Sequence, residues 1–206
     1  MRPECSLVAG LLLGGVSMLL GAQQVALNMQ STAEEKAVNL CSSCHGPRGV
    51  STSPEFPILA AQQAAYFARQ IEAFRDHSRA EKDAHDFMWG VAAQLDETVV
   101  DSLAQYYAAQ APAQGRMGDS GLAMKGKELF DRGVPERGVP ACAMCHGQNA
   151  EGRGEFPRLA GQHAKYVAKQ LRAIGTGERG NAVMHGVIKG LTSDEAQAVA
   201  AYVQSR

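Results

Sequence analysis

The stretches Cys41-Ser-Ser-Cys-His45 and Cys142-Ala-Met-Cys-His146 decide the fold of this chain. In each stretch two cysteines stand three residues apart, a spacing that brings both thiols to one side of a helical turn. A histidine follows the second cysteine directly in both cases. Because the same pattern occurs twice, it indicates two copies of one small structural unit.

The chemistry that this motif offers is the covalent attachment of a haem. Two thiols at this spacing can add to the two vinyl groups of one haem, and the adjacent histidine can then reach the iron. The first motif supplies Cys41, Cys44 and His45, and the second supplies Cys142, Cys145 and His146. The sequence therefore predicts two covalently bound haem c groups, each with one histidine ligand.

Three other uses of cysteine pairs compete with this interpretation. A thioredoxin-like redox pair belongs in a βαβ setting, which the sequence does not suggest, and would not explain the repeated histidine. A zinc site could use both pairs, but one pair lies in each repeat, about a hundred residues from the other. A disulfide within one motif would close a very small loop. Haem attachment is the favoured hypothesis because it uses all three residues of both motifs.

The rest of the chain repeats as well. A shift of 100 residues aligns a series of identical residues, which in the first copy are Phe56, Pro57, Leu59, Ala60, Gln62, Ala64, Tyr66, Ala68, Gln70 and Ala73. The offset is 101 at the cysteines and 96 at Met88 and Met184, so the copies differ by short insertions. We expect a leader over residues 1–30, a first domain over 31–110, a linker over 111–121 and a second domain over 122–206.

The spacing of apolar residues is helical in both copies. Ser31 and Glu34 form a capping-box pattern that opens a helix running into Cys41. Further helices are predicted over the ranges 62–74 and 97–109 in the first copy, and over 125–132, 162–174 and 193–204 in the second. Continuous period-two alternation is missing. The predicted fold class is all-α, with two tandem domains that each wrap around one haem.

The sixth position of each iron decides between electron transfer and ligand chemistry. Met88 and Met184 occupy equivalent places in the two copies, and each is followed by an x-Gly-Val step. A single methionine is more often core filler, but the repeated placement favours both as axial ligands. The remaining histidines have no counterpart in the other copy and are expected to be solvated or to lie behind the ligands; they are His77, His85, His163 and His185. His85 and His185 stay as alternative ligands because they neighbour the methionines.

The amino terminus indicates export. Residues 7–20 are apolar apart from one serine and several glycines, which is typical of a secretory signal and short for a membrane span. The pattern for cleavage after Ala22 or Ala26 is poor, because Leu20 or Gln24 stands at the −3 position, so a retained inner-membrane anchor is the alternative. Cys5 precedes the apolar run and is not a lipoprotein acylation site. We therefore expect a periplasmic protein that is either free or tethered to the membrane.

The chain resembles tandem class I cytochromes c, most closely the di-haem cytochrome c4 family. The resemblance covers about residues 31–206. It rests on Cys-His-Gly at 44–46 and 145–147, on Phe-Pro-x-Leu-Ala at 56–60 and 156–160, and on Gly-Lys-Glu-Leu-Phe at 126–130. The first copy lacks a glycine equivalent to Gly126, so its first helix is expected to pack differently. Its loop at 75–87 is also longer and more charged than 175–183.

The resemblance implies a role for each site residue. His45 and His146 would be the proximal iron ligands, and Met88 and Met184 the distal ones. In the class I fold the carbonyl of the equivalent proline accepts the Nδ1 hydrogen of the ligating histidine, which implies this role for Pro57 and Pro157. Such a hydrogen bond fixes the imidazole ring and tunes its basicity.

Closed axial positions favour an electron carrier over an enzyme. The resemblance implies a shuttle from a quinol-oxidising complex, the quinol-cytochrome c reductase, to a terminal oxidase, and no small-molecule substrate is expected. A di-haem electron-accepting subunit of a dehydrogenase, for example one that oxidises sulfide or an alcohol, is the alternative. A di-haem peroxidase would need an open or displaceable iron ligand.

The charge distribution is uneven although the total is small. The 206 residues are 45% hydrophobic and 20% charged with a net charge of −1, which excludes a disordered or polytopic membrane protein and gives no reason to expect nucleic acid. Residues 31–110 carry a net charge of −5 and residues 121–206 a net charge of +4. We expect the two domains to meet different partners, through Glu72, Asp76 and Glu81 in the first and Lys165, Lys169 and Arg172 in the second.

Overall fold

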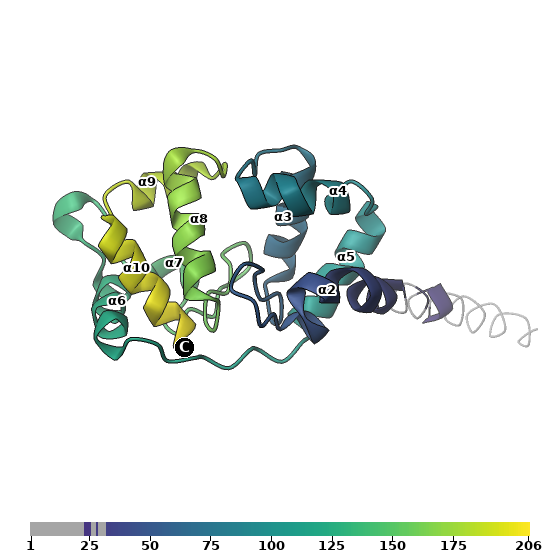
Figure 1. Cartoon of the computed structure of the whole chain (residues 1–206), viewed down its shortest axis with the longest axis horizontal. Helices are drawn as coiled ribbons and strands as arrows, with labels where there is room; N and C mark the ends of the chain where they lie inside the picture. The colour runs from purple at the N-terminus through teal and green to yellow at the C-terminus, as the bar shows by residue number, and fades with distance from the viewer. Residues whose placement is uncertain (1–22, 26–27, 29–31) are drawn as a thin grey trace, which may run out of the picture.

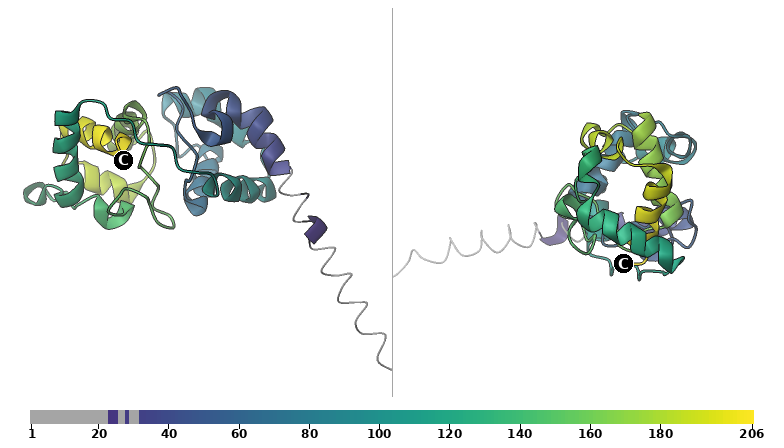
Figure 2. Two further views of the ribbon diagram at one scale, coloured as in Figure 1. Left: turned by 90° about the horizontal axis from the view of Figure 1, so that it is seen from below. Right: turned by 90° about the vertical axis from the view of Figure 1, so that its left-hand side faces the viewer.

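The structure, a computed structural model, describes residues 23–25, 28 and 32–206, and these residues are mostly helical (Figure 1). The helices gather in two groups that lie side by side, and an extended linker joins them along one edge (Figures 1 and 2). No strand occurs within the described ranges, where the β-pairing is limited to isolated bridges. The predicted all-α class is confirmed.

Each group contains a short helix with the cysteine motif and two longer helices at equivalent places. The first group consists of η1 (Ala37–Cys41), α2 (Ser42–His45), η2 (Pro47–Gly49), α3 (Ala64–Arg75), η3 (Ala84–Met88), α4 (Trp89–Ala92) and α5 (Glu97–Ala108). The second consists of α6 (Ser120–Arg132), η4 (Pro135–Arg137), α7 (Ala143–His146), α8 (Ala164–Thr176), α9 (Ala182–Ile188) and α10 (Ser193–Gln204). Helical residues 32–36 precede η1.

Side-chain caps explain where several helices begin. Asp96, Asp119 and Thr192 each accept a hydrogen bond from a backbone N–H in the first turn of the helix that follows, namely α5, α6 and α10. Helix α10 matches its predicted range, whereas α6 starts at Ser120, inside the segment predicted as linker. Helices α3 and α8 begin two residues after the predicted start, because Gln63 and His163, the residues that precede them, have non-helical backbone angles.

The first and last helices pack differently in the two halves. In the second half, Gly126 of α6 lies so close to α10 that a Cβ at this position would stand 1.9 Å from the Ala198 carbonyl oxygen. In the first half Ala33 and Ala37 are buried in the cluster that contains Leu103, and the helix passes through the π-helical turn η1 before α2. The first helix of the first half therefore packs through two buried alanines and a π-helical turn, whereas the second half packs its first helix through a glycine.

The two halves are joined by reciprocal hydrogen bonds. Gln162 accepts from the Ile58 N–H and donates to the Ile58 carbonyl, both at 2.9 Å. Gln62 makes the same pair with Arg158, at 2.8 and 3.1 Å. The two glutamines are aligned residues of the repeat, so the halves face each other about an approximate twofold axis.

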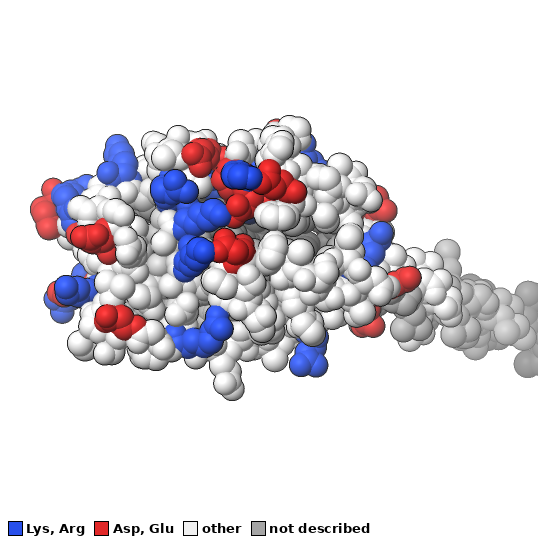
Figure 3. Space-filling view, viewed as in Figure 1, with Lys and Arg blue, Asp and Glu red and all other residues white. Residues whose placement is uncertain are grey.

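Charged residues gather along the line where the halves meet (Figure 3). Lys165 pairs with Glu55, Lys169 pairs with Asp83, and Arg69 pairs with Glu155 at 3.0 Å. These are ion pairs between the two halves, and we call this surface the seam.

This arrangement corrects part of the charge hypothesis. Lys165 and Lys169 were expected to face a partner of the second domain, and Glu81 a partner of the first. The lysines instead pair across the seam, and Glu81 is 3% exposed and bonded to Arg79. Charge counts along the chain could not distinguish a docking surface from the contact that joins the two halves.

The predicted leader, with Cys5 and the cleavage positions, lies outside the described residues except for 23–25 and 28. Within the part of the chain that the structure describes, no helix combines the length and apolar character needed to cross a membrane.

Candidate haem sites

The histidine of each motif is held by a backbone carbonyl from the loop that follows. His45 ends α2 and is 8% exposed, and its Nδ1 lies 2.9 Å from the Pro57 carbonyl oxygen. His146 ends α7, is 6% exposed, and makes the same contact with Pro157 at 3.0 Å. A carbonyl oxygen can only accept, so Nδ1 carries the hydrogen and the Nε2 lone pair is left for a metal. The contact expected for both prolines is present.

Burial keeps both imidazoles neutral. It lowers the pKa of His45 and of His146 from their ordinary value, and the hydrogen bonds to the proline carbonyls oppose this effect without cancelling it. A neutral imidazole with a fixed Nδ1–H is the form that ligates iron, because a protonated ring has no free lone pair. Each site is therefore prepared for coordination by its fold.

A glycine after each histidine lets the chain turn back toward its proline. Gly46 has φ +74° and Gly147 has φ +83°, a region that side chains rarely adopt. A Cβ at Gly46 would stand 2.2 Å from the Val50 carbonyl oxygen. The glycine of the Cys-His-Gly pattern is thus required by backbone geometry as well as by space.

The partly buried thiols of Cys41 and Cys142 do not have the character of thiolates. Desolvation raises the pKa of Cys41 and raises that of Cys142 to about 11. Redox-active and metal-binding cysteines have lowered pKa values, so neither thiol resembles a thioredoxin nucleophile. Among the described residues no three His, Cys, Asp or Glu side chains gather in a way that could hold a metal ion. The raised pKa values disfavour the thioredoxin-like hypothesis.

Aromatic contacts connect the first histidine to the methionine segment. Phe56 lies edge-on to His45 with ring centres 6.2 Å apart, and Phe87 lies edge-on to Phe56 at 5.4 Å. Met88 follows Phe87 directly, ends η3 and is half-buried against the same core cluster as Cys41. The predicted ligand Met88 and the motif residue Cys41 therefore pack against the same hydrophobic cluster.

The second methionine stands on a better-defined helix. Met184 lies in the first turn of α9, and its backbone N–H donates to the side chain of Asn181, the N-cap, at 2.9 Å. Helix α9 packs against α8, and Met184 is half-buried. At the offset of 96 that aligns the two methionines, His85 stands in the first copy where Asn181 stands in the second, and its Nδ1 contacts Asp86 instead. The pairing of each methionine with its histidine stays a prediction.

The four other histidines do not share one environment. His77 stacks on Trp89 with ring centres 3.7 Å apart, and His85 lies edge-on to the same indole. His185 donates through Nδ1 to the Ile174 carbonyl at 2.9 Å. The prediction of a solvated histidine is wrong for His163, which is fully buried at the seam.

A buried cluster of arginines and glutamines at the seam was missed by the sequence argument. Arg79 and Arg179 are 5% and 7% exposed, and both donate to the amide oxygens of Gln70 and Gln170. Arg179 also donates to the Tyr66 hydroxyl at 2.5 Å. These arginines are aligned by the shift of 100, so polar identities within the repeat were the signal that could have revealed the contact between the halves.

This cluster holds more positive than negative charge. Glu81 is the carboxylate bonded to Arg79, and its second oxygen is buried without a hydrogen-bond partner in the structure. Buried charges normally require compensation. An anionic group in the interior between the halves fits the excess, and the carboxylates of a haem are such a group.

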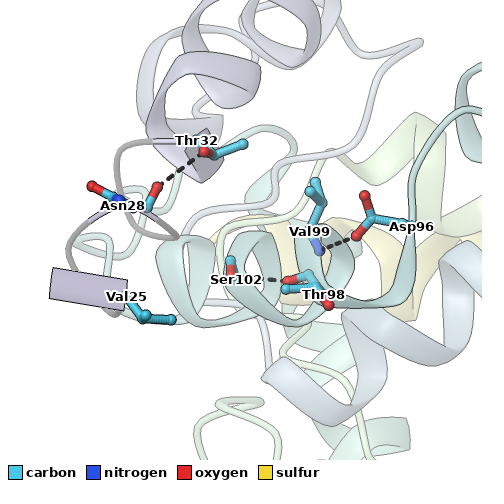
Figure 4. A pocket seen from close by; sticks show the side chains of 7 residues that line it. All are labelled: Val25, Asn28, Thr32, Asp96, Thr98, Val99 and Ser102. Carbon is cyan, nitrogen blue, oxygen red and sulfur yellow. Dashed lines mark hydrogen bonds between the residues drawn. The ribbon is translucent and has the colours of Figure 1, made fainter. Parts of the chain in front are cut away.

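A surface hollow lies apart from both motifs, beside the start of α5 (Figure 4). Its lining consists of Val25, Asn28, Thr32, Asp96, Thr98, Val99 and Ser102. In it the Val99 N–H donates to Asp96 and the Thr32 hydroxyl donates to the Asn28 carbonyl. The lining offers no cysteine, histidine or methionine, so this hollow is not a haem site.

Comparison with known proteins agrees with the motifs. Residues 123–206 match the family model for cytochrome c. Cytochrome c-552 of Acidithiobacillus ferridurans is 37% identical over 201 residues, which cover 95% of this chain and 86% of that protein. Cytochrome c4 of Thiocapsa roseopersicina is 39% identical over 178 residues, covering 83% and 89%. The solved cytochrome c4 of Acidithiobacillus ferrooxidans has a TM-score of 0.76 and 40% identity, covering 81% of this chain and 98% of its own.

Two further matches are named for thiosulfate dehydrogenase. The thiosulfate dehydrogenase electron acceptor of Thiomonas intermedia is 35% identical over 173 residues, which cover 81% of this chain and 78% of that protein. The solved thiosulfate dehydrogenase of Marichromatium purpuratum has a TM-score of 0.75 and 36% identity, and the match covers 87% of this chain and 40% of that one.

Proposed function

Because this chain belongs to the di-haem cytochrome c4 family, whose members transfer electrons and are not enzymes, we propose that it carries electrons from a quinol-oxidising complex to a terminal oxidase. The observation that carries the proposal is the pair of motif histidines, each buried and neutral with Nδ1 bonded to a proline carbonyl. A histidine held in this way keeps the same ring orientation when the iron is oxidised and when it is reduced. Little movement of the protein is therefore needed when an electron is transferred.

The family carries two covalently bound haem c groups, and the residues present fit them. Cys41 and Cys44 would hold one haem and Cys142 and Cys145 the other, because each pair lies on the helical turn that ends in the ligating histidine. When bound, each haem supplies one reversible oxidation and reduction of its iron.

The protein's own residues then define what the sites do. His45 and His146 donate from Nδ1 to the proline carbonyls and so keep Nε2 directed away from that contact. Met88 and Met184 would be the second protein ligand of each iron, and a thioether ligand beside a histidine ligand raises the reduction potential of a haem. Closed sites favour electron exchange with proteins over the binding of a substrate.

The proposed location is the periplasm, where the protein is either free or attached to the inner membrane through the amino-terminal segment. The support is the apolar run at residues 7–20 and the presence of two Cys-x-x-Cys-His motifs behind it. A quinol-oxidising complex and an oxidase of the inner membrane would both be within reach of a protein held there.

A second candidate function is that of electron acceptor for a thiosulfate-oxidising enzyme. It is favoured by the likeness to the thiosulfate dehydrogenase electron acceptor of Thiomonas intermedia and to the thiosulfate dehydrogenase of Marichromatium purpuratum. Both functions use the same haem sites, and they differ in the protein that donates electrons.

Reduction kinetics separate the two functions. We expect the oxidised holoprotein to be reduced rapidly by quinol through isolated quinol-cytochrome c reductase, and to be reoxidised by membranes that contain a terminal oxidase. Stopped-flow absorbance measures both rates. Rapid reduction by thiosulfate dehydrogenase with thiosulfate, together with slow reduction by the reductase, would contradict the first function and support the second.

Charge variants in the same assay test whether the two halves meet different partners. Glu72 on α3 and Arg172 on α8 are exposed and carry opposite charges. If the halves are used separately, Glu72→Lys slows the reaction with one partner and Arg172→Glu the reaction with the other, and both effects fade as salt screens the charges over about 8 Å. Equal effects of each variant on both partners would contradict the two-ended arrangement.

A further inference from the structure

His163 is a histidine buried where three parts of the chain meet. It is the N-cap residue of α8 and has no exposed surface. Its Nε2 lies 3.1 Å from the Ser51 carbonyl oxygen in the first half, and its Nδ1 lies 2.5 Å from a guanidinium nitrogen of Arg116 in the linker. The Arg116 backbone is itself tied to α10, because its N–H donates to the Gln204 carbonyl at 2.8 Å.

These contacts permit one protonation state. A carbonyl oxygen can only accept, so Nε2 must carry the hydrogen; a guanidinium can only donate, so Nδ1 must present its lone pair. The ring is therefore neutral in the docked arrangement. A second proton could be placed only at Nδ1, where it would point at the N–H of a cation.

The first half makes the equivalent contact without a titratable group. Gln63 is the counterpart of His163 under the shift of 100, and its Nε2 donates to the Glu151 carbonyl at 3.1 Å. Each half therefore reaches across the seam from the N-cap of its long helix to the loop behind the other half's motif histidine. One of the two contacts depends on pH and the other does not.

The charged groups near the ring come from several elements. Arg116 from the linker is the cation that acts on the imidazole, and the first half presents the Ser51 carbonyl. On α8 the charged side chains of Lys165 and Lys169 turn to the carboxylates of the first half. At the end of α10, Arg206 turns its guanidinium to Asn149, its backbone oxygen lies beside Gly115 and Gly161, and Gln204 is uncharged. Among the side chains that the structure describes, no Asp or Glu carboxylate is bonded to this imidazole.

We propose that His163 is a pH-sensitive latch between the two halves, which holds them docked while it is neutral and loosens the seam when it takes up a proton. The latch acts on the loop of residues 46–57, which also carries the carbonyl that orients His45. It thereby makes the relative position of the two motif sites depend on pH.

The direction of the effect follows from burial and charge. Desolvation lowers the pKa of His163, and Arg116 lowers it further, against the hydrogen bond to Ser51. The undocked state keeps a histidine pKa near the ordinary value of about 6.5. Docking is therefore at full strength above that pH. As the pH falls below it, the undocked state binds a proton first, and the ratio of docked to undocked molecules decreases by up to about tenfold per pH unit.

Hydrogen exchange at amides that bond across the seam measures this ratio. The Ala80 N–H donates to the Glu178 carbonyl and the Gly180 N–H donates to the Ser78 carbonyl, so both are freed when the halves separate. The experiment uses NMR to compare the unmodified protein with the variant His163→Gln, both as reduced holoproteins, between pH 7.5 and 5. Glutamine is chosen because it is the residue at the equivalent position of the first half. At each pH the ratio of the two proteins' rates for one amide cancels the intrinsic effect of pH. The rate in the unmodified protein relative to the variant should increase by up to about tenfold per pH unit below about 6.5.

Two further measurements keep the test decisive. Amides inside α5 do not cross the seam and should show no such trend. The ¹⁵N shifts of the His163 ring should show the Nε2–H tautomer at pH 7.5 and a pKa below 6.5 in the unmodified protein, and this pKa should rise in Arg116→Gln. A ratio of exchange rates that stays constant with pH would overturn the proposal. A His163 pKa at or above its ordinary value would also overturn it, and this second measurement needs only the unmodified protein, so it holds even if the glutamine variant fails to fold.

Discussion

Replacing Met184 by alanine is expected to remove half of the near-infrared absorption that a methionine sulfur gives with ferric haem, and to lower the potential of one haem. Axial ligands span roughly 0.8 V of haem potential, and the loss of a thioether should account for a decrease on the order of 0.1 V or more. Met88→Ala should do the same to the other haem. Absorption spectroscopy and a potentiometric titration measure both effects.

Other methionines supply a matched control. Met144 lies within the second motif and Met124 on α6, and they are 71% and 70% exposed. Their alanine variants should leave the near-infrared band and both potentials unchanged. If the unmodified ferric protein were high-spin, or if Met88→Ala left the band intact, the assignment of the methionines would be wrong, and an open site suited to peroxide chemistry would return as a hypothesis.

Replacing Gly126 by alanine should destabilise the second half by about 3 kcal/mol, the upper part of the usual range for overpacking. The added Cβ would stand 1.9 Å from the Ala198 carbonyl oxygen and 2.8 Å from the Tyr202 Cβ. Backbone cannot yield as a flexible side chain does, so α6 and α10 must move apart. Urea denaturation, followed by the far-ultraviolet helical signal, measures the lower midpoint.

Gly175 provides the control for this variant. It lies on α8, and the nearest atom to an added Cβ is 3.9 Å away. Gly175→Ala should be neutral or should stabilise the protein by about 0.5–1 kcal/mol, because alanine has the higher helix propensity. Equal stability of Gly126→Ala and the unmodified protein would show that the close packing of α6 on α10 is not needed.

The helices and the motif chemistry could be predicted because both depend on local patterns. The range of α10 follows from its apolar spacing, and the haem motif follows from the position of two cysteines and a histidine. The contacts of Pro57 and Pro157 with the histidines came from family resemblance, since residues about twelve apart cannot be paired by periodicity alone.

The seam could not be predicted because it depends on how two whole units meet. Lys165 and Lys169 are ion-paired to Glu55 and Asp83, which belong to the first half, so their partners are known only once the two halves are docked. His163 has a polar neighbour in each of two distant segments, and no spacing rule connects residue 163 to residues 51 and 116. The sequence shows that Gln62, Gln70 and Arg79 are identical to their counterparts in the second copy. Their role in joining the halves becomes clear only in the docked structure.

The central claim is that this chain holds two covalent haems, one on Cys41 and Cys44 and one on Cys142 and Cys145. Mass spectrometry of the denatured protein, made in a cell competent for cytochrome c maturation, tests it most directly. We expect the polypeptide to retain the mass of both haems, and peptides containing residues 41–45 and 142–146 each to carry one. A protein that came out of such a cell without haem would contradict the account.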